Sequence, residues 1–281
     1  MMIKNVPIKC EGSMPYASLT LYIQENKPDL AVIRRPLVLL CPGGAYFFTS
    51  DRESEPLALT FLNTGCHAAI LNYSVRPARY PVALKEVAAS MIYIREHADE
   101  FNIDADKIIL QGCSAGGHLA ASYCCLWDRE LLSDKKDISI LKPNGLILCY
   151  PVITSGEYAH RGSFENLLGE ENCNNTEMLD MLSLEKRAGA QVPNTFIWHT
   201  FEDESVPVEN SLLFAQALSR AKVRTELHIF PEGGHGLSLA NEITLGRSGK
   251  ELQESCQKWP LLAAEWIHSF YPLTLELDKD L

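Results

Sequence analysis

Two side chains that could act as nucleophiles, Cys113 and Ser114, lie next to each other in the stretch "IILQGCSAGGHLAAS". A nucleophile held on a sharp turn between a strand and a helix needs small residues two positions before and two positions after it. Gly112 and Gly116 meet this requirement for Ser114. A central Cys113 would instead place Gln111 at the first of these positions. The pattern therefore predicts that Ser114 is the nucleophile and that Cys113 packs beneath the turn.

A serine hydroxyl becomes a strong nucleophile when an imidazole removes its proton and a carboxylate orients that imidazole. Two polar loops downstream follow apolar strand candidates, "FEDESVP" and "EGGHG". The second loop holds His235, and the first offers Asp203 between two glutamates. Ser114, an acid of the first loop and His235 stand in the order nucleophile, acid, base, which one large class of hydrolases shows. We predict a catalytic triad of Ser114, His235 and one of the three acids Glu202, Asp203 and Glu204.

Other residues compete for the roles of acid and base. Glu202, Asp203 and Glu204 compete for the role of the acid. His118 follows Ser114 by four residues and is expected on the helix surface or in local packing. His199 stands at the end of a strand, before the acid in the sequence. A base at this position would break the expected chain order, so the alternative role of His199 is to support the catalytic groups.

A carbonyl oxygen that becomes negatively charged during acyl transfer needs fixed N–H donors, which form an oxyanion hole. The N–H of Ala115, directly after the nucleophile, is predicted to be one donor. The stretch "LLCPGGAY" runs from an apolar strand into Gly43 and Gly44, where a close backbone approach requires glycine. We predict the second donor in this stretch, with the N–H groups of residues 43–45 as the alternatives.

Substrate contacts are expected close to these donors. Ala45, Tyr46 and Phe47 follow the glycine pair, and His160 lies in a long polar segment further along the chain. For the two aromatic rings, packing against the helix that follows is the alternative.

Short apolar runs bounded by Gly, Pro or Asn alternate with segments of helical periodicity. The strands are predicted over residues 18–25, 37–41, 67–73, 107–112, 145–150, 194–200 and 225–231. The helices are predicted over residues 54–64, 82–100, 115–127, 207–222 and 253–270. This alternation predicts an α/β fold with a mainly parallel sheet and helices on both faces. The loops with the predicted catalytic residues then meet at the carboxyl edge of the sheet.

Residues 154–192 interrupt this alternation. Loops of this length usually form functional lids or carry helices of their own. Apolar side chains at about 164–168 and 178–182 predict two short amphipathic helices. We expect one domain over residues 1–281, with the insertion as a small cap over the carboxyl edge; an insertion that does not touch the substrate is the alternative.

The composition excludes several classes of partner. The formal net charge is −11, which argues against a nucleic-acid surface, because such surfaces gather Lys and Arg. No apolar run approaches the roughly 18 residues that span a bilayer, and the first residues do not resemble a secretion signal. The nine cysteines are odd in number and lack CxxC spacing, which disfavours disulfides and metal sites. We expect a cytoplasmic protein without metal or cofactor.

Several stretches together resemble the carboxylesterase-type α/β-hydrolases, and among them the acetyl xylan esterase-like bacterial esterases often labelled xylanase B-like. They are "CPGGAYFFTSDRESEPLA", "NYSVRPARYPVALKE", "GCSAGGHLAA", "DESVPVENS" and "GGHGLSLA". The likeness covers most of residues 30–270. The acid loops of these esterases place the aspartate four residues before a proline, as Asp203 stands before Pro207. The resemblance therefore implies that Asp203 is the acid of the triad and that Glu202 and Glu204 are solvated. Related lipases show HGGG where this chain has "PGGA", so Ala45 replaces the last glycine.

The resemblance implies an α/β-hydrolase fold and a cofactor-free serine esterase. It also implies short acyl groups, notably acetyl esters on sugars or xylo-oligosaccharides. The expected partner is a small-molecule ester, and a homo-oligomer is compatible with the sequence. A small-cap peptidase and a non-catalytic binding protein on the same fold are the alternatives.

Overall fold

The computed structural model describes residues 1–129, 131–132 and 138–277, and these form a nine-stranded sheet. Eight strands follow the order β1-β2-β4-β3-β5-β6-β7-β8, and β9 pairs with β3. The strands are β1 (Met2–Pro7), β2 (Ser18–Ile23), β3 (Val32–Cys41), β4 (His67–Asn72), β5 (Ile103–Cys113), β6 (Gly145–Cys149), β7 (Asn194–Thr200), β8 (Thr225–Phe230) and β9 (Thr274–Leu275).

The six strands from β4 to β8 in this order run parallel, whereas β1, β2 and β9 pair antiparallel. Every residue of β6 is buried, and so is the end of β3 from residue 35 onward. Continuous apolar runs form strands of this kind because both faces of the sheet are covered. The predicted α/β fold with a mainly parallel sheet is therefore confirmed.

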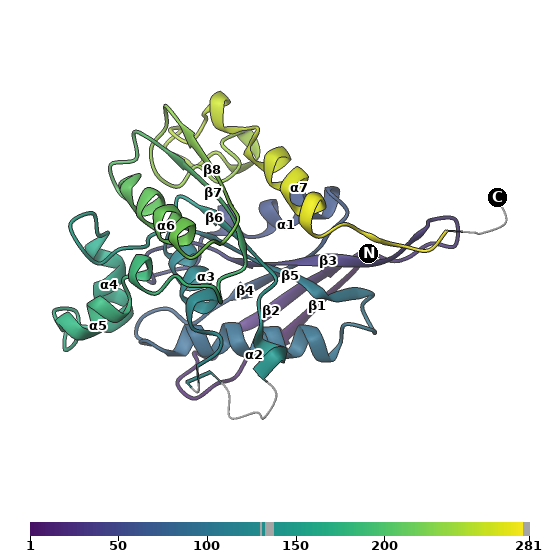
Figure 1. Cartoon of the computed structure of the whole chain (residues 1–281), viewed down its shortest axis with the longest axis horizontal. Coiled ribbons are helices and arrows are strands. Elements are labelled where there is room, and N and C mark those ends of the chain that lie inside the picture. The colour runs from purple at the N-terminus through teal and green to yellow at the C-terminus, as the bar shows by residue number, and fades with distance from the viewer. Residues whose placement is uncertain (130, 133–137, 278–281) are drawn as a thin grey trace.

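Helices cover both faces of the sheet (Figure 1). The helices α1 (Glu55–Asn63) and α7 (Trp259–Phe270) pack over one face, where they share a buried apolar cluster with the sheet. A second cluster on the other face includes α2 (Val82–Glu96), α3 (Ser114–Leu126) and α6 (Glu209–Arg220). All twelve residues from Ser114 to Cys125 are buried, so the helix that follows the predicted nucleophile lies in the centre of the fold.

The insertion at residues 154–192 carries two short helices, α4 (Arg161–Leu168) and α5 (Thr176–Met181), as the apolar pattern predicted. Phe164 and Leu167 of α4 are buried in the cluster around α3. Figure 1 shows both helices together at one end of the molecule, beside α3 and α6. The insertion is thus packed onto the body of the protein, and its role as a cap remains a prediction.

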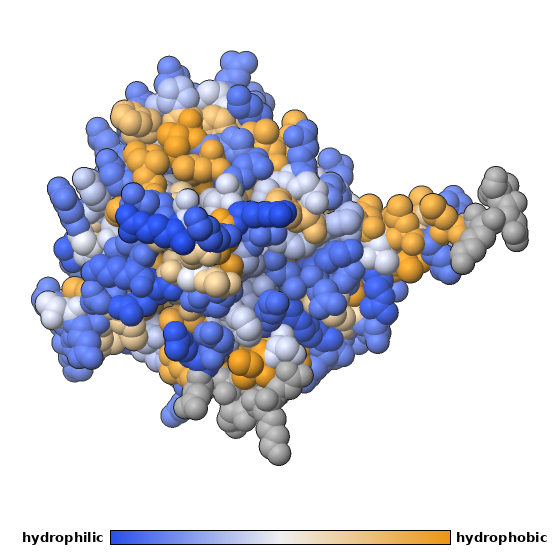
Figure 2. Space-filling view, in the orientation of Figure 1, coloured by the Kyte–Doolittle hydropathy of each residue, from blue (hydrophilic) through white to orange (hydrophobic). Residues whose placement is uncertain are grey.

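The beginning of β3 and the two residues of β9 form an arm that projects from the body. Leu30, Leu275 and Leu277 on this arm are each at least half exposed. Figure 2 shows apolar side chains gathered there, next to a surface that is largely hydrophilic.

None of the helices within the described ranges is long and apolar enough to cross a membrane.

Candidate active site

The turn between β5 and α3 holds Ser114 in a strained conformation. Its φ angle is +53°, in the left-handed region that non-glycine residues rarely adopt. A Cβ atom on Gly112 would collide with the carbonyl of Gly116, and one on Gly116 would collide with the carbonyl of Cys41. Strand, turn and helix therefore pack so closely that both flanking positions require glycine, and Ser114 is presented at the carboxyl end of β5.

Three residues distant in the sequence meet at this turn. The Oγ atom of Ser114 lies 2.7 Å from Nε2 of His235, which belongs to the loop after β8. The Nδ1 atom of His235 lies 2.6 Å from Oδ2 of Asp203, in the loop after β7. Because the carboxylate can only accept, Nδ1 of His235 carries the proton and Nε2 is free to accept the proton of the Ser114 hydroxyl. This is the geometry that general-base activation of a serine requires.

Asp203 is buried and held as a carboxylate. Burial acts to raise its pKa, but hydrogen bonds from His199, His235 and the N–H of Val206 outweigh this effect and hold the pKa well below its usual range. The Oδ1 atom accepts the N–H groups of Ser205 and Val206 at 3.0 and 2.9 Å. Both oxygens are therefore fixed before any substrate binds, and the carboxylate orients His235.

His199 supports Asp203 from behind, the alternative role that the sequence left for it. Its Nε2 atom lies 2.9 Å from the carbonyl oxygen of Val206 and 3.2 Å from Oδ2 of Asp203. Since a carbonyl only accepts, Nε2 bears the proton, and Nδ1 accepts from the Ser211 hydroxyl at 2.8 Å. The i, i+4 spacing of His199 and Asp203 is the one signal in the sequence that could have indicated this contact.

The N–H of Gly43 is not available as an oxyanion donor, in contrast to the prediction. It donates to Oε2 of Glu53 at 2.8 Å. The glycine is nevertheless required, because a Cβ atom there would lie 3.0 Å from Cβ of Ser114. Gly44 and Ala45 adopt φ angles of +128° and +55°, and within the described part of the chain their N–H groups have no acceptor. These two groups and the N–H of Ala115 are the remaining candidates.

The carbonyl groups of this segment, residues 43–46, which we call the oxyanion loop, are all bonded. The carbonyl of Gly43 accepts from the N–H of Ser50, and that of Gly44 from the N–H of Phe47. The carbonyl of Ala45 accepts from Nδ2 of Asn166 on α4. The carbonyl of Tyr46 accepts from the N–H of Arg76. With its acceptors bonded in this way, the loop keeps unbonded donors at Gly44 and Ala45.

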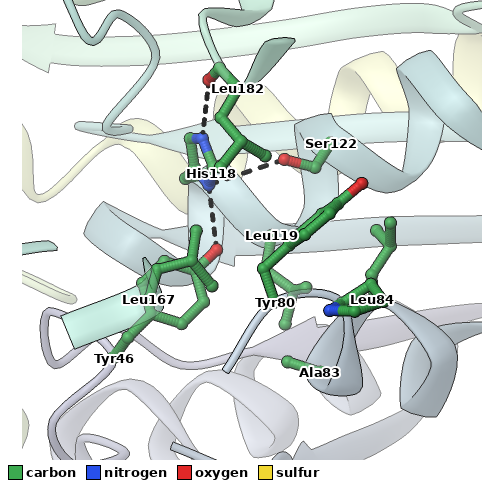
Figure 3. Close-up of a pocket in the computed structure, with 10 residues that line it drawn as sticks. Tyr46, Tyr80, Ala83, Leu84, His118, Leu119, Ser122, Leu167 and Leu182 are labelled. Carbon is green, nitrogen blue, oxygen red and sulfur yellow. Dashed lines mark hydrogen bonds between the residues drawn. The ribbon is translucent and has the colours of Figure 1, made fainter. Parts of the chain in front are cut away.

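The side chain of Tyr46 points into the protein, in contrast to the predicted role as a substrate contact. The side chain is only 3% exposed, and its hydroxyl lies 2.9 Å from Nδ1 of His118 (Figure 3). His118 donates from Nε2 to the carbonyl of Leu182 at 3.0 Å, so its Nδ1 accepts the Tyr46 proton. The tyrosine packs against α3 because a buried partner for its hydroxyl lies there. His118 is packed locally, and it does not lie on the helix surface.

The burial of His118 predicts a pH-dependent stability. Burial lowers the pKa of His118 to about 4, whereas an unfolded histidine titrates near pH 6.5. Between these values the unfolded chain binds a proton that the folded chain does not, so the free energy of unfolding falls as the pH drops from about 6.5 to about 4. We expect His118→Gln to remove up to about 3 kcal/mol of this fall, measured by urea unfolding at pH 7 and pH 4.5. Parallel pH curves for the two proteins would contradict this assignment.

Phe47 and His160 remain candidate substrate contacts. Phe47 is half exposed, and the guanidinium of Arg76 lies 3.6 Å from the centre of its ring. Nδ1 of His160 accepts the N–H of Ser163 at the start of α4. Burial lowers the pKa of His160, and the Asp203 carboxylate acts in the opposite direction.

Cys113 is buried beneath the turn, as predicted. Burial raises the pKa of its thiol well above the usual value, and Nε2 of Gln111 donates to its Sγ atom at 3.1 Å. Only the thiolate of a cysteine is strongly nucleophilic, so Cys113 is inert at neutral pH. The nine cysteines, all within the described ranges, are free, and seven of them are buried.

A family model described as BD-FAE matches residues 19–218. The endo-1,4-beta-xylanase B of Butyrivibrio fibrisolvens is 40% identical over 228 residues, which are 78% of this chain and 35% of that protein. The acetylxylan esterase of Xylanibacter ruminicola is 26% identical over 224 residues, which are 78% of this chain and 43% of that protein. The chain thus spans less than half the length of either curated relative.

Solved structures match nearly the whole chain. An acetyl ester-xyloside bifunctional hydrolase from Caldicellulosiruptor lactoaceticus is 35% identical with a TM-score of 0.80, covering 92% of this chain and 89% of that one. A carboxylesterase from Lactobacillus plantarum is 27% identical with a TM-score of 0.82, covering 98% and 100%. An alpha/beta hydrolase from a deep-sea metagenome library is 31% identical with a TM-score of 0.76, covering 96% and 98%. These likenesses confirm the predicted α/β-hydrolase fold.

Proposed function

We propose that this chain, which belongs to the BD-FAE family of α/β-hydrolases, is a serine carboxylesterase that removes short acyl groups. The observation that carries the proposal is the hydrogen-bonded series from Ser114 through His235 to Asp203, with distances of 2.7 and 2.6 Å. A structural serine does not need a left-handed φ angle, a histidine acceptor and a buried carboxylate together. Acyl transfer needs all three.

In the proposed reaction, Oγ of Ser114 attacks the ester carbonyl while its proton moves to Nε2 of His235. Asp203 stabilises the resulting imidazolium. The negative charge on the former carbonyl oxygen is held by the N–H groups of Ala115 and Gly44, with that of Ala45 beside them. The C–O bond to the alcohol breaks as His235 returns the proton to the leaving oxygen. Water then gives a proton to Nε2 of His235 and attacks the acyl carbon. The bond between this carbon and Oγ breaks, the acid leaves, and His235 returns the proton to Ser114.

The relatives support acetyl esters of sugars as the substrate class. One curated relative is named for acetylxylan and one solved structure for an acetyl ester and a xyloside, which is why we place this chain among deacetylases of sugar esters. A glycosidase would need two carboxylates on either side of the glycosidic bond. The acid of this site, Asp203, has both oxygens occupied by N–H donors and is unavailable for that role.

The free cysteines support a reducing compartment, which is typical of the cytoplasm.

An ester panel tests the proposed function. We expect the purified protein to hydrolyse nitrophenyl acetate with a kcat/KM at least about tenfold above that for nitrophenyl octanoate, because each pocket methylene shifts selectivity by about 1–3 kcal/mol. Acetate release from acetylated xylo-oligosaccharides and from other acetylated sugars, measured in parallel, defines the alcohol portion. A preference for octanoate would contradict the short-acyl assignment, and faster cleavage of peptide amides than of esters would contradict the esterase assignment.

A further inference from the structure

Glu53 is a buried carboxylate beside the site that the proposed reaction does not use. It belongs to the 3-10 turn Asp51–Glu53, and only 4% of its surface is exposed. Its Oε2 atom accepts the N–H of Gly43 at 2.8 Å, and its Oε1 atom accepts the hydroxyl of Tyr150 at 2.7 Å. A carboxylate is costly to bury unless its oxygens are bonded. The two donors belong to two different segments of the site, and this indicates a role for the Glu53 carboxylate.

Tyr150 continues the contact to the loop of His235. Its hydroxyl oxygen accepts the N–H of Ser238, three residues after His235, at 2.9 Å. The ring of Tyr150 meets the ring of His235 edge-on, with the centres 5.2 Å apart. Glu53 is therefore bonded on one side to the oxyanion loop and, through Tyr150, on the other side to the segment that carries the general base.

Glu53 also lies directly behind the nucleophile. A Cβ atom on Gly43 would be 2.6 Å from Oε2 of Glu53 and 3.0 Å from Cβ of Ser114. The carboxylate and the serine thus both border the space where a side chain on Gly43 would lie, so the two groups are close neighbours of this glycine. A shift of the Gly43 backbone would displace the following N–H groups, at Gly44 and Ala45, relative to the ester carbonyl.

We propose that Glu53 is a positioning residue for the esterase reaction, which holds the oxyanion loop and the His235 loop in fixed relation to Ser114. This inference rests on the proposed function of the same site. The benefit comes from the two hydrogen bonds and not from the negative charge, since a charge so close to a developing oxyanion would oppose it. A glutamine, which keeps one acceptor oxygen, should therefore retain more activity than an alanine.

The test compares Glu53→Ala, Glu53→Gln and Tyr150→Phe with the wild type. The measurements are kcat and KM on nitrophenyl acetate, the inhibition constant of a trifluoromethyl ketone, and the melting temperature. The ketone forms an adduct with Ser114 whose oxygen is an oxyanion, so it reports the donors directly. Because loss of one donor costs about 10²- to 10³-fold in kcat, we expect a loss of about 10²-fold for Glu53→Ala and about tenfold for each of the other two variants. KM should stay within about threefold, and the inhibition constant should rise in parallel with the loss of kcat.

Glu86→Gln is the matched control. Glu86 is also fully buried and accepts a backbone N–H, that of Ser74, together with the hydroxyl of Ser13, but it lies on α2 outside the site. We expect this variant to lower the melting temperature and to leave kcat and the inhibition constant unchanged. The variant therefore shows how the loss of a purely structural carboxylate changes the melting temperature, kcat and the inhibition constant.

Wild-type kcat and ketone affinity in Glu53→Gln and Tyr150→Phe would overturn the inference, even if Glu53→Ala does not fold. A lower melting temperature without a change in ketone affinity would equally reduce Glu53 to a structural role. These failures differ from failure of the proposed function. If the proposed function is wrong, Ser114→Ala keeps wild-type esterase activity. If only the role of Glu53 is wrong, Ser114→Ala is still inactive.

Discussion

Ser114→Ala is expected to lower kcat for nitrophenyl acetate by about 10⁴- to 10⁶-fold, since removal of a nucleophile whose partners are intact leaves only the oxyanion donors and binding. The Oγ atom of Ser114 lies 2.7 Å from the accepting nitrogen of His235. Its loss should leave the fold unchanged, because alanine fits wherever this serine does. The rate of nitrophenolate release, with circular dichroism to verify folding, measures the effect.

Cys113→Ala is the control for the adjacent thiol. Its Sγ atom is buried and protonated at neutral pH, so we expect activity within about threefold of wild type and some loss of stability from the cavity. If Cys113→Ala were inactive while Ser114→Ala remained active, the assignment of the nucleophile would be reversed.

Asp203→Asn is expected to cost about 10⁴-fold in kcat, because the amide would favour the wrong tautomer of His235 and could not stabilise its positive charge. The N–H groups of Ser205 and Val206, which now bond the carboxylate, can still bond an amide oxygen, so the loop geometry should be retained. Initial rates from pH 6 to pH 9 measure the loss across the range in which a serine esterase works.

Glu204→Gln is the matched control, because it makes the same chemical change one residue away on an exposed side chain. We expect its kcat to equal that of the wild type. A comparable loss in both variants would show that the loop as a whole, and not the Asp203 carboxylate, matters. Full activity in Asp203→Asn would exclude Asp203 as the orienting acid.

The elements that position the site were predictable from the sequence because their signals are local. The central strands are continuous apolar runs, and the helix predicted over residues 54–64 is observed as α1, from Glu55 to Asn63. By contrast, β1 alternates between exposed and half-buried residues, and β9 has only two residues. Such edge strands carry no continuous apolar run, so nothing in the sequence marked them.

The same distinction holds within the site. Ser114 could be predicted from its glycine frame, and the geometry now places Asp203 and His235 beside it. The positions of Glu53 and Tyr46 could not be predicted, because each depends on which way a side chain points. The side chain of Tyr46 points into the protein because its hydroxyl forms a hydrogen bond with Nδ1 of the buried His118, 72 residues away. The partners of Glu53 come from two other segments of the chain, Gly43 and Tyr150.

The bonding of the oxyanion loop has a consequence for how temperature acts on the proposed activity. Its carbonyl groups are tied to the segment before α1, to Arg76 and to Asn166 of α4, so the donors are ordered when the chain folds and not when the substrate arrives. Little reorganisation energy is then left for the chemical step. The entropy of ordering the donors is a cost of folding, so heat inactivation should coincide with global unfolding and should not precede it.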